Sequence, residues 1–378
     1  MKILVCGNGN VTRKNGKICL HHEIVRFLSE LHAMGNKVGY ATVVVDEKNE
    51  KVKNLADGTL PDGIVLHGFT PWSTLSPLKK CFLFLPMFLQ IMRLTLHYDL
   101  IYCYYPGTLT KIFIFCCRLY HKGFSLYVRG EMVPTATVIQ DLQEAEFILA
   151  TGRQLVLNIY PECKNCDDVV PMTGIFQEQH TLLPRDFHTP LEGLFVGRVE
   201  RNKGVYELLD AAEKLQQMAI PVHFTLVGAY HEEFQKELEK RHLTELVTLA
   251  GIASSPEILA EYYQRADFFC FPTYSEGFPR VLYEAMAWSL PCMTTMVGGI
   301  PSWMQAEKNC LALEVKSAQS VINAIVRLTK DPVLYQQLSM AAFTTFEQCC
   351  EKFNANGSHA RQLIMKYETK HKEKTCQK

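Results

Sequence analysis

Short apolar runs alternate with amphipathic stretches along most of the chain, and this alternation predicts the fold class. Apolar and β-branched runs predict strands. In the first half they lie at Ile3–Cys6, Lys37–Val45, Ile64–His67, Leu100–Tyr104, Ser125–Val128, Phe147–Ala150 and Val169–Met172. Between several of them the apolar spacing is helical, as where Ile24, Leu28 and Leu31 share one face. The pattern predicts βαβ units and a mainly parallel sheet. Gly7–Asn10, after the first run, is interpreted as a turn-forming loop.

The same alternation starts again after a polar stretch that contains Pro184, His188 and Pro190. Further strands are predicted at Leu194–Val196, His223–Val227, Val247–Ala250, Asp267–Phe271 and Cys292–Thr295. We therefore expect an α/β protein with an N-terminal domain over residues 1–178, a linker over 179–190, a C-terminal domain over 191–345 and a final helix and tail over 346–378. Two consecutive βα domains favour a ligand site in a cleft between them.

Composition narrows the class of protein but names no partner. A chain of 378 residues with 48% hydrophobic and 21% charged residues is typical of a globular, two-domain protein. Lys+Arg and Asp+Glu both total 39, so net charge gives no reason to expect a nucleic-acid partner. The 14 cysteines often adjoin apolar residues, which predicts buried thiols in a reducing cytoplasm. Cys163 and Cys166 form a C-x-x-C pair, but no second pair with zinc-ligand spacing accompanies it. No signal peptide is recognised at the N-terminus.

The apolar stretch Cys81–Tyr98 raises the question of a membrane. Its most apolar part, Cys81–Met92, is interrupted by Pro86 and Gln90 and is too short to span a bilayer. The stretch lies in a basic region from Lys79 to Arg129 in which Asp99 is the only acid. One interpretation is a helix that lies in the interface of an anionic membrane. The other is a buried helix of the first domain. Both stay open, and we expect peripheral attachment to the cytoplasmic leaflet.

The segment Ser275–Ala285 carries the most informative chemistry. It follows a predicted buried strand and opens a helix, so unpaired N–H groups at the helix start offer a seat for a phosphate. Gly277 lets the main chain approach a ligand closely. Glu276 could accept hydrogen bonds from sugar hydroxyls, and Glu284 suits a ribose diol. Two glutamates near a helix start are also expected from the helix dipole alone.

The segment Gly193–Val205 is the second element that joins a strand to a helix. Arg198 and Lys203 both lie in the connection. Two cations at the carboxyl edge of a parallel sheet can neutralise a diphosphate. The alternative is a pair of solvated surface cations.

Together these segments resemble glycosyltransferase family 4, whose members have the two-domain GT-B fold. The resemblance lies in the "GR…KG" segment, in the E-x7-E spacing of Glu276 and Glu284, and in Pro291–Pro301. It covers most of residues 191–315 and is diffuse over the N-terminal half. It implies two Rossmann-like domains that face a central cleft, with a C-terminal helix that crosses back to the N-terminal domain.

The resemblance also implies roles for individual residues. Arg198 and Lys203 would hold the donor diphosphate, the amides of Gly277 to Arg280 (with Phe278 and Pro279 between) would contact phosphate and sugar, and Glu276 would face the transferred sugar. Glu284 would hold the ribose, and the loop at Gly251 and Ile252 the base. Gly9, Arg129 and Glu131 would lie on the acceptor side. The family often has an acid after the Gly-Gly-x-Pro segment and a histidine near Arg129. This chain has Ser302 and Val128-Arg129-Gly130-Glu131 there.

The leading hypothesis is a retaining transferase that moves a hexose from a UDP- or GDP-sugar to a saccharide, in cell-surface polysaccharide or lipid-linked glycan synthesis. The chain has no Asp-x-Asp motif, so no metal or other cofactor is expected. A sugar-nucleotide 2-epimerase would need further acid/base residues, and a catalytically silent nucleotide-sugar-binding protein would be expected to lose the charged residues. A dehydrogenase lacks its full glycine fingerprint at Gly7–Asn10. His21 and His22, at the start of the first helix, are interpreted as solvated or capping.

Overall fold

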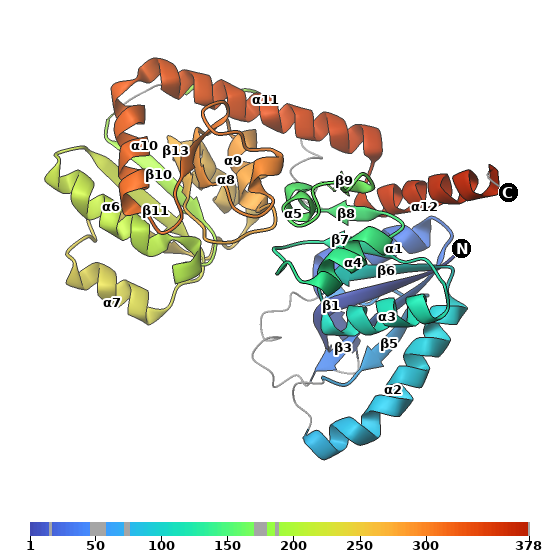
Figure 1. Cartoon of the computed structure of the whole chain (residues 1–378). Helices are drawn as coiled ribbons and strands as arrows, with labels where there is room; N and C mark the ends of the chain where they lie inside the picture. Colours follow the sequence, from blue (N-terminus) through green and yellow to red (C-terminus); the bar gives the residue numbers. More distant parts are fainter. Residues whose placement is uncertain (15–16, 46–57, 72–75, 170–179, 186–188, 377–378) are drawn as a thin grey trace. The chain divides into compact units, whose positions relative to one another are not determined.

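The chain folds into two α/β units (Figure 1). A computed structural model describes residues 1–14, 17–45, 58–71, 76–169, 180–185 and 189–376. Unit 1 comprises Met1–Met172 together with Asn356–Lys378, and unit 2 comprises Thr173–Ala355. Each unit has its own sheet, and no helix among the described residues is long and apolar enough to cross a membrane.

The sheet of unit 1 is mainly parallel. Its parallel strands lie in the order β5–β3–β1–β6–β7–β8–β9. They comprise β1 (Lys2–Lys14), β3 (Lys37–Val45), β5 (Val65–Phe69), β6 (Leu100–Tyr105), β7 (Ser125–Val128), β8 (Ile148–Ala150) and β9 (Cys166–Asp168). This is the doubly wound order of a Rossmann-like sheet. Two short strands, β2 (Lys17–Leu20) and β4 (Gly58–Thr59), add an antiparallel edge.

Helices cover both faces of this sheet, because successive side chains of each strand point to opposite faces. In β1, Ile3 and Val5 belong to one core, which α1 (His22–Ala33) and α12 (His359–Cys376) complete. Leu4 and Cys6 belong to the other, packed with α2 (Pro77–His97), α3 (Thr108–Leu119), α4 (Ala136–Glu144) and α5 (Gln154–Leu157). This double burial explains why the strands are apolar runs without polar alternation.

Two predictions for unit 1, a loop and a strand, differ from the structure. The loop expected at Gly7–Asn10 was wrong, because β1 continues to Lys14. Its pairing with β3 shifts between Cys6 and Asn10 and then resumes, so these residues form an irregularity within a strand rather than a turn. The strand expected at Val169–Met172 is displaced: β9 ends at Asp168, and residues 170–172 lie outside the described part of the chain.

The sheet of unit 2 is wholly parallel, in the order β12–β11–β10–β13–β14–β15. Its strands are β10 (Leu191–Val196), β11 (Val222–Val227), β12 (Val247–Gly251), β13 (Phe268–Phe271), β14 (Cys292–Thr295) and β15 (Cys310–Leu313), the last not foreseen from the sequence. The helices are η4 (Arg201–Lys203), α6 (Val205–Gln217), α7 (Glu232–Lys240), α8 (Pro256–Arg265), α9 (Arg280–Ala287), η5 (Ile300–Ser302), α10 (Ala318–Lys330) and α11 (Pro332–Asn356).

The C-terminal border lies later than predicted. We expected the final segment to leave the C-terminal domain at residue 346, but α11 runs unbroken to Asn356 and unit 2 extends to Ala355. Phe346 and Cys349 are buried on this helix, so its apolar face extends past the predicted border. The helix stops before Gly357, whose φ of 73° suits glycine. Helix α12 then packs on α1 with Ala360 and Leu363 in the core of unit 1, which agrees with the expected return of the chain.

Candidate functional site

The candidate site lies at the topological switch point of unit 2. Chain connections run outward in opposite directions from β10 and β13, which are neighbours in the sheet. Loops that follow two such strands separate and leave a crevice at the carboxyl edge, where open α/β sheets bind ligands. The loop after β10 carries Arg198 and Lys203, and the loop after β13 carries Glu276 and Gly277. The sheet order therefore brings the two predicted segments to one edge.

Gly204 allows the two loops to meet. Its φ of 73° is in the left-handed region, and a Cβ atom there would lie 2.0 Å from the carbonyl oxygen of Pro272. Such a contact excludes any larger residue without a backbone shift. The Tyr274 amide also donates to the Asn202 carbonyl at 2.9 Å, so a main-chain hydrogen bond joins the two loops close to the glycine.

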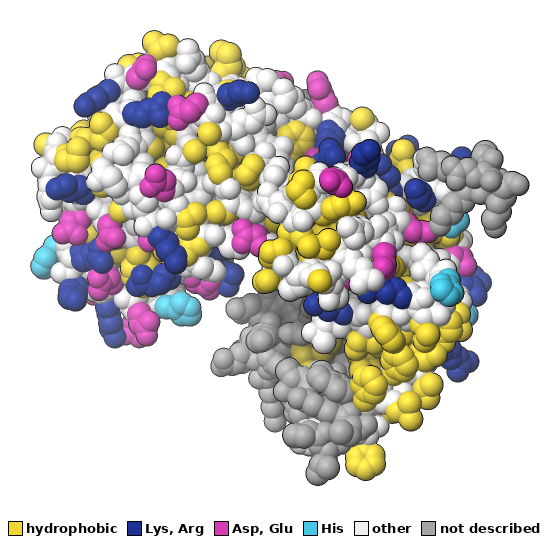
Figure 2. Space-filling model, in the orientation of Figure 1, with side chains coloured by type: hydrophobic (Ala, Val, Ile, Leu, Met, Phe, Trp, Pro, Cys, Tyr) yellow, Lys and Arg dark blue, Asp and Glu magenta, His cyan; other side chains and the backbone are white. Residues whose placement is uncertain are grey.

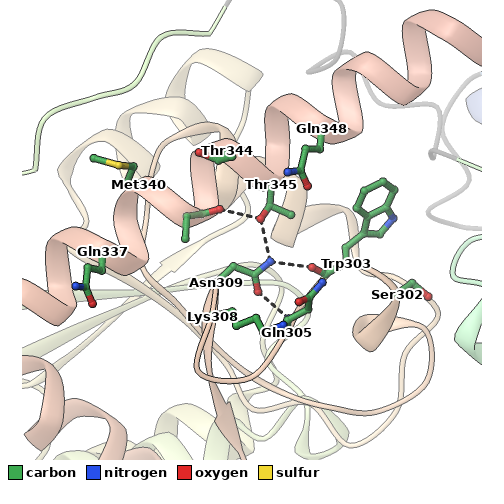
Figure 3. Close-up of a pocket in the computed structure, with 11 residues that line it drawn as sticks. Ser302, Trp303, Gln305, Lys308, Asn309, Gln337, Met340, Thr344, Thr345 and Gln348 are labelled. Carbon is green, nitrogen blue, oxygen red and sulfur yellow. Dashed lines mark hydrogen bonds between the residues drawn. The ribbon is translucent and has the colours of Figure 1, made fainter.

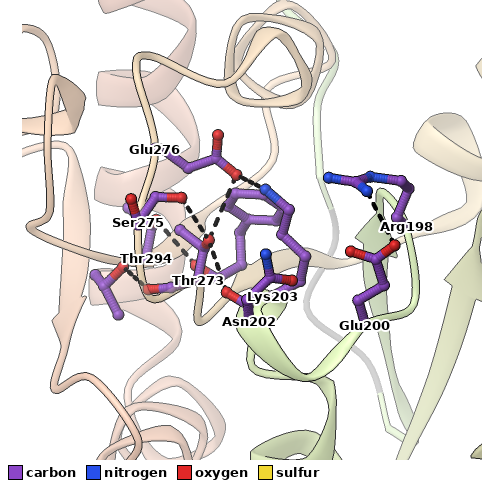
Figure 4. Close-up of polar contacts among 10 residues, drawn as sticks. Arg198, Glu200, Asn202, Lys203, Thr273, Ser275, Glu276 and Thr294 are labelled. Atoms are coloured by element: carbon purple, nitrogen blue, oxygen red, sulfur yellow. Dashed lines mark hydrogen bonds and ion pairs between the residues drawn. The ribbon is translucent and has the colours of Figure 1, made fainter. Parts of the chain in front are cut away.

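Lys203 and Glu276 form an ion pair across the two loops (Figure 4). The Lys203 ammonium contacts Glu276 Oε1, and the side chains are only 14% and 16% exposed, respectively. The Thr273 hydroxyl donates to the same carboxylate oxygen at 3.4 Å, and the ring of Phe271 lies 5.9 Å from the ammonium. The residues predicted to hold the diphosphate and the sugar are thus in direct contact, each holding the other in place.

Arg198 lies at the more open end of this group. Its side chain is 65% exposed and donates to Glu200 Oε1 at 2.9 Å. In Figure 4 its guanidinium extends toward the side on which Lys203 and Glu276 meet. A largely exposed guanidinium can exchange a nearby carboxylate for a phosphate at little cost, because exposed ion pairs contribute less than about 1 kcal/mol.

Helix α9 presents its first turn beside Glu276. The helix begins at Arg280 after Pro279, and the carbonyl of Gly277 accepts from the Gly299 amide at 2.8 Å. That bond ties the Gly277 loop to the Gly298–Gly299 turn. One expected detail needs correction on chemical grounds: Pro279 has no N–H, so Gly277, Phe278 and Arg280 are the possible amide donors. Arg280 is exposed, whereas Phe278 is buried against Tyr283 with ring centroids 4.4 Å apart.

Glu284 lies on α9 and is largely buried. The Tyr263 hydroxyl donates to its Oε2 atom at 2.8 Å, which leaves Oε1 outside that bond. Burial raises the pKa of the Glu284 carboxyl above its ordinary value, while the Tyr263 hydrogen bond and the charge of Arg280 act in the opposite direction. A carboxylate oriented by a buried tyrosine is suited to accept hydroxyl protons from a neutral sugar.

The predicted base-binding loop lies at the end of β12. Gly251 has a φ of 71°, and its carbonyl accepts from the Gly228 amide at 2.7 Å. The next residue, Ile252, is 74% exposed. An exposed apolar side chain beside a glycine is compatible with an aromatic base, but no contact in the structure joins this loop to Lys203 or Glu276.

Unit 2 also contains a cavity that was not foreseen from the sequence (Figure 3). It has a volume of about 550 Å³ and lies between the segment from Ser302 to Asn309 and one side of α11. Asn309 forms its base, with Nδ2 donating to the Trp303 carbonyl and to Thr345 Oγ1, both at 2.9 Å. Its lining is mostly neutral and scattered through the sequence, so no motif could have indicated it.

The predicted acceptor-side residues lie in unit 1 and are brought together only in part. Arg129 follows β7, lies over the Tyr127 ring at 5.9 Å and has its guanidinium 3.9 Å from Glu23 Oε2. Glu131 is exposed two residues further on, and Gly9 lies in β1. Glu23 was not among the residues predicted from the sequence. It stands at the start of α1, where a carboxylate is common for helical reasons alone.

The histidines beside Glu23 have a structural role and one further chemical possibility. His21 caps α1, because its Nδ1 atom accepts from the Glu23 amide at 3.4 Å. Ligand atoms of His21, His22 and Glu23 lie within 4.8 Å of one another, and among the described residues no other group of three could hold a metal ion. Arg129 competes for the same carboxylate. Cys163 and Cys166 are buried and form no disulfide.

Comparison with known proteins relates unit 2 to glycosyltransferases. Residues 186–345 match the model of a family described as glycosyl transferases group 1. A Bacillus subtilis protein named as a teichuronic acid biosynthesis glycosyltransferase is 31% identical over 176 residues, which cover 47% of this chain and 41% of that one. A D-inositol 3-phosphate glycosyltransferase of Pseudarthrobacter chlorophenolicus is 30% identical over 185 residues (46% and 43%). The chain thus spans less than half the length of these two relatives.

Solved structures extend the similarity in fold to nearly the whole chain. HepE of Anabaena, solved in complex with UDP, has a TM-score of 0.62 at 15% identity and covers 94% of this chain and 100% of its own. Sucrose-phosphate synthase of Thermosynechococcus elongatus has a TM-score of 0.64 at 18% identity, covering 97% and 98%. With the two sheets, these similarities confirm the predicted GT-B fold of two Rossmann-like units. At these identities the similarity is one of fold alone, and membership of family 4 stays a prediction.

Proposed function

We propose that this protein is a retaining glycosyltransferase that moves a hexose from a nucleoside-diphosphate sugar to a saccharide acceptor without a metal ion. The observation that carries the proposal is the Lys203–Glu276 pair at the switch point of unit 2, inside the segment that matches glycosyl transferases group 1. A cation and a carboxylate held together there can bind the two parts of such a donor, the diphosphate and the sugar. Lys203 and Arg198 would take the diphosphate, and Glu276 the hydroxyls of the sugar.

The reaction breaks the bond between the anomeric carbon and the diphosphate oxygen. Negative charge grows on the departing phosphate, and fixed donors aimed at it are worth about 3 kcal/mol each. Lys203, Arg198 and the amides at the start of α9 are the candidates for that task. The acceptor oxygen forms the new bond on the same face of the sugar, and the departing phosphate takes the acceptor's proton. No separate protein base is then needed.

Similar proteins support the substrate classes. The HepE structure holds UDP in one case and UDP with glucose in another, which favours a UDP-hexose donor here. Relatives are named for teichuronic acid and amylovoran biosynthesis, which favours a growing saccharide as acceptor. We place Arg129 and Glu131 of unit 1 on the acceptor side, with Gly9. We also propose that the protein works in the cytoplasm at the inner face of the membrane, where lipid-linked acceptors are available.

A donor panel tests the proposal directly. The purified chain is incubated with UDP- and GDP-sugars in the presence of EDTA, and release of the nucleoside diphosphate is followed with and without saccharide acceptors. We expect one donor to be hydrolysed slowly in EDTA. An anomeric product assay by NMR then reports retention. Loss of all activity in EDTA, restored by a divalent cation, would contradict the metal-free mechanism and direct attention to His21, His22 and Glu23.

Glu284→Ala is expected to raise the KM for the donor by about 10- to 100-fold, the cost of one hydrogen bond to a charged group, and to change kcat less. The reason is that Glu284 is proposed to hold the ribose and not the reacting atoms. Tyr263→Phe is the matched control, because it removes the hydroxyl that orients Glu284 Oε2 but leaves the carboxylate. Its KM should lie between those of the wild type and Glu284→Ala. Wild-type kinetics for Glu284→Ala would remove the ribose assignment.

A further inference from the structure

Two neighbouring helices of unit 1 expose an unusual set of large apolar side chains. On α2 these are Phe82, Leu83, Phe84, Leu85, Leu89 and Leu96, and on α3 they are Phe115 and Leu119. We call this set the α2–α3 outer face. Phe82 is 81% exposed, and Figure 2 shows hydrophobic side chains gathered over α2. A contiguous apolar surface of this kind in a soluble protein marks an interaction site.

The outer face belongs to well-packed helices. Ile91 and Leu94 on the inner side of α2 are buried in the unit 1 core, together with Tyr98, which directly follows the helix, and Phe113 of α3. The expected burial of this stretch is thus confirmed for one side of α2, whereas the other side is exposed and its contact with a membrane stays a prediction. Phe88 links the two helices across the surface, stacking on Phe84 at 5.7 Å and lying 6.1 Å from Phe115. The apolar side chains therefore stand on a rigid support.

The charged residues of the two helices themselves are all cations. Helices α2 and α3 contain no Asp or Glu, and their cations are Lys79, Lys80, Arg93, Lys111 and Arg118. Arg118 is neutralised by Asp141 and Glu144 of α4. Arg93 and Lys111 are exposed, and within the described part of the chain neither forms an ion pair. Apolar side chains with cations beside them match the acyl boundary and the headgroups of an anionic bilayer.

We infer that the α2–α3 outer face docks unit 1 on the surface of an anionic lipid bilayer. A second copy of the chain fits less well, because a two-fold contact would set cations against cations with no carboxylate on either helix. A cavity of about 180 Å³ between the end of β5 and α2 adjoins the face at Leu83, and Phe69, Pro86 and Met87 also line it. Gly68, Thr70 and Gln90 complete its lining, which is therefore partly polar.

The inference names the partner of the proposed transferase but does not rest on its chemistry. Binding is measured by sedimentation of the full chain with vesicles of phosphatidylcholine alone or with phosphatidylglycerol added, at low salt and without donor or acceptor. We expect pelleting with the anionic vesicles and release at high salt. A failure here leaves the donor assay untouched, and an inactive protein can still bind vesicles.

Matched variants distinguish binding through this face from nonspecific binding of the protein to vesicles. Leu85→Glu should weaken vesicle binding at least tenfold, since it removes an exposed leucine that would be buried in the bilayer on docking and adds a charge repelled by the anionic lipid. Val333→Glu, at an equally exposed site on α11 of unit 2 (65% against 61%), should bind as the wild type does. Arg93→Gln with Lys111→Gln should weaken binding to anionic vesicles by about fivefold for each cation. Circular dichroism checks that all variants are folded.

Several results would overturn the inference. They are wild-type protein that stays in the supernatant with anionic vesicles, Leu85→Glu that binds as tightly as the wild type, and equal loss of binding in Val333→Glu. Equal affinity for neutral and anionic vesicles would remove the role of Arg93 and Lys111. A wild-type dimer in size-exclusion chromatography that Leu85→Glu converts to a monomer would assign the face to a second copy.

Discussion

Lys203→Met is expected to lower kcat for sugar transfer by about 100- to 1,000-fold, the loss found when one donor to a developing negative charge is removed. The ammonium is largely shielded from water and faces the carboxyl edge of the sheet at its switch point. A charge in such a place acts on a departing phosphate with less screening than an exposed one. Steady-state kinetics with the donor found in the panel measures the effect.

The same substitution also leaves Glu276 without its counter-charge, so stability has to be separated from catalysis. Breaking a buried pair from one side costs about 3–5 kcal/mol, although the partial exposure of both side chains reduces that figure. Lys203→Met combined with Glu276→Gln should recover most of the stability in urea unfolding and none of the activity. Lys214→Met, at an exposed position on α6, is the charge-matched control and should keep wild-type kinetics. Activity that returns with stability would show that Lys203 has only a structural role.

Acid is expected to destabilise unit 1 through His359, and this is the second large effect. His359 is the first residue of α12 and is 2% exposed. Its Nε2 atom lies 2.7 Å from the Tyr102 hydroxyl, and its ring packs on Phe27 and Tyr127 at 4.4 and 4.3 Å. Burial, with a smaller contribution from the charge of Arg129, lowers the pKa of this histidine from 6.5 to about 3.

The sign follows from which state takes up the proton. Below about pH 6.5 the imidazole is protonated in the unfolded chain and still neutral in the folded one, so acid favours unfolding. The stabilisation is fully present above pH 6.5 and is lost as the pH falls toward 3. Its slope is about 1.4 kcal/mol per pH unit, and the total is about 5 kcal/mol. Urea unfolding of the whole chain at pH 7, 5 and 4 measures it through the transition of unit 1.

His359→Gln should flatten this pH dependence, because glutamine can bond to the Tyr102 hydroxyl but does not titrate. The substitution should lower the free energy of unfolding at pH 7. Between pH 7 and pH 4 this free energy should fall less than it does in the wild type. His371→Gln is the control on the same helix: His371 Nδ1 lies 3.1 Å from the Tyr367 carbonyl oxygen on the exposed part of α12. An unchanged acid slope in His359→Gln would assign the effect to other groups.

The comparison between sequence and structure is clearest in the strands. Runs such as Ser125–Val128 and Cys292–Thr295 were predicted to the residue, because strands covered on both faces consist mainly of apolar and β-branched residues. Gly7–Asn10 failed, because glycine and asparagine favour a turn locally. Whether β1 stops there depends on the pairing of Val11 and Thr12 with β3, a partner far along the chain. Local preference lost to tertiary pairing at that point.

The candidate site, like the strands, was predictable from the sequence only in part. The sequence was enough to predict the charged residues of the site, because binding a diphosphate and a diol needs those functional groups beside a strand end. These residues are Arg198, Lys203, Glu276 and Glu284. Their partners were not predictable: neither the contact of Lys203 with Glu276 nor the bond from Tyr263 to Glu284 has a signature in the chain. The Asn309 cavity and the role of α3 in the outer face were likewise invisible.

The chain by itself determined the fold class, the two-fold repetition of βα units and the charged residues at two strand ends. Those features depend on periodicity and on chemistry within a few consecutive residues. Only the tertiary structure decided which of these residues touch, where the last long helix ends and which side of α2 is exposed. Each of those outcomes depends on contacts between residues far apart in sequence, and such contacts are set by how whole elements pack.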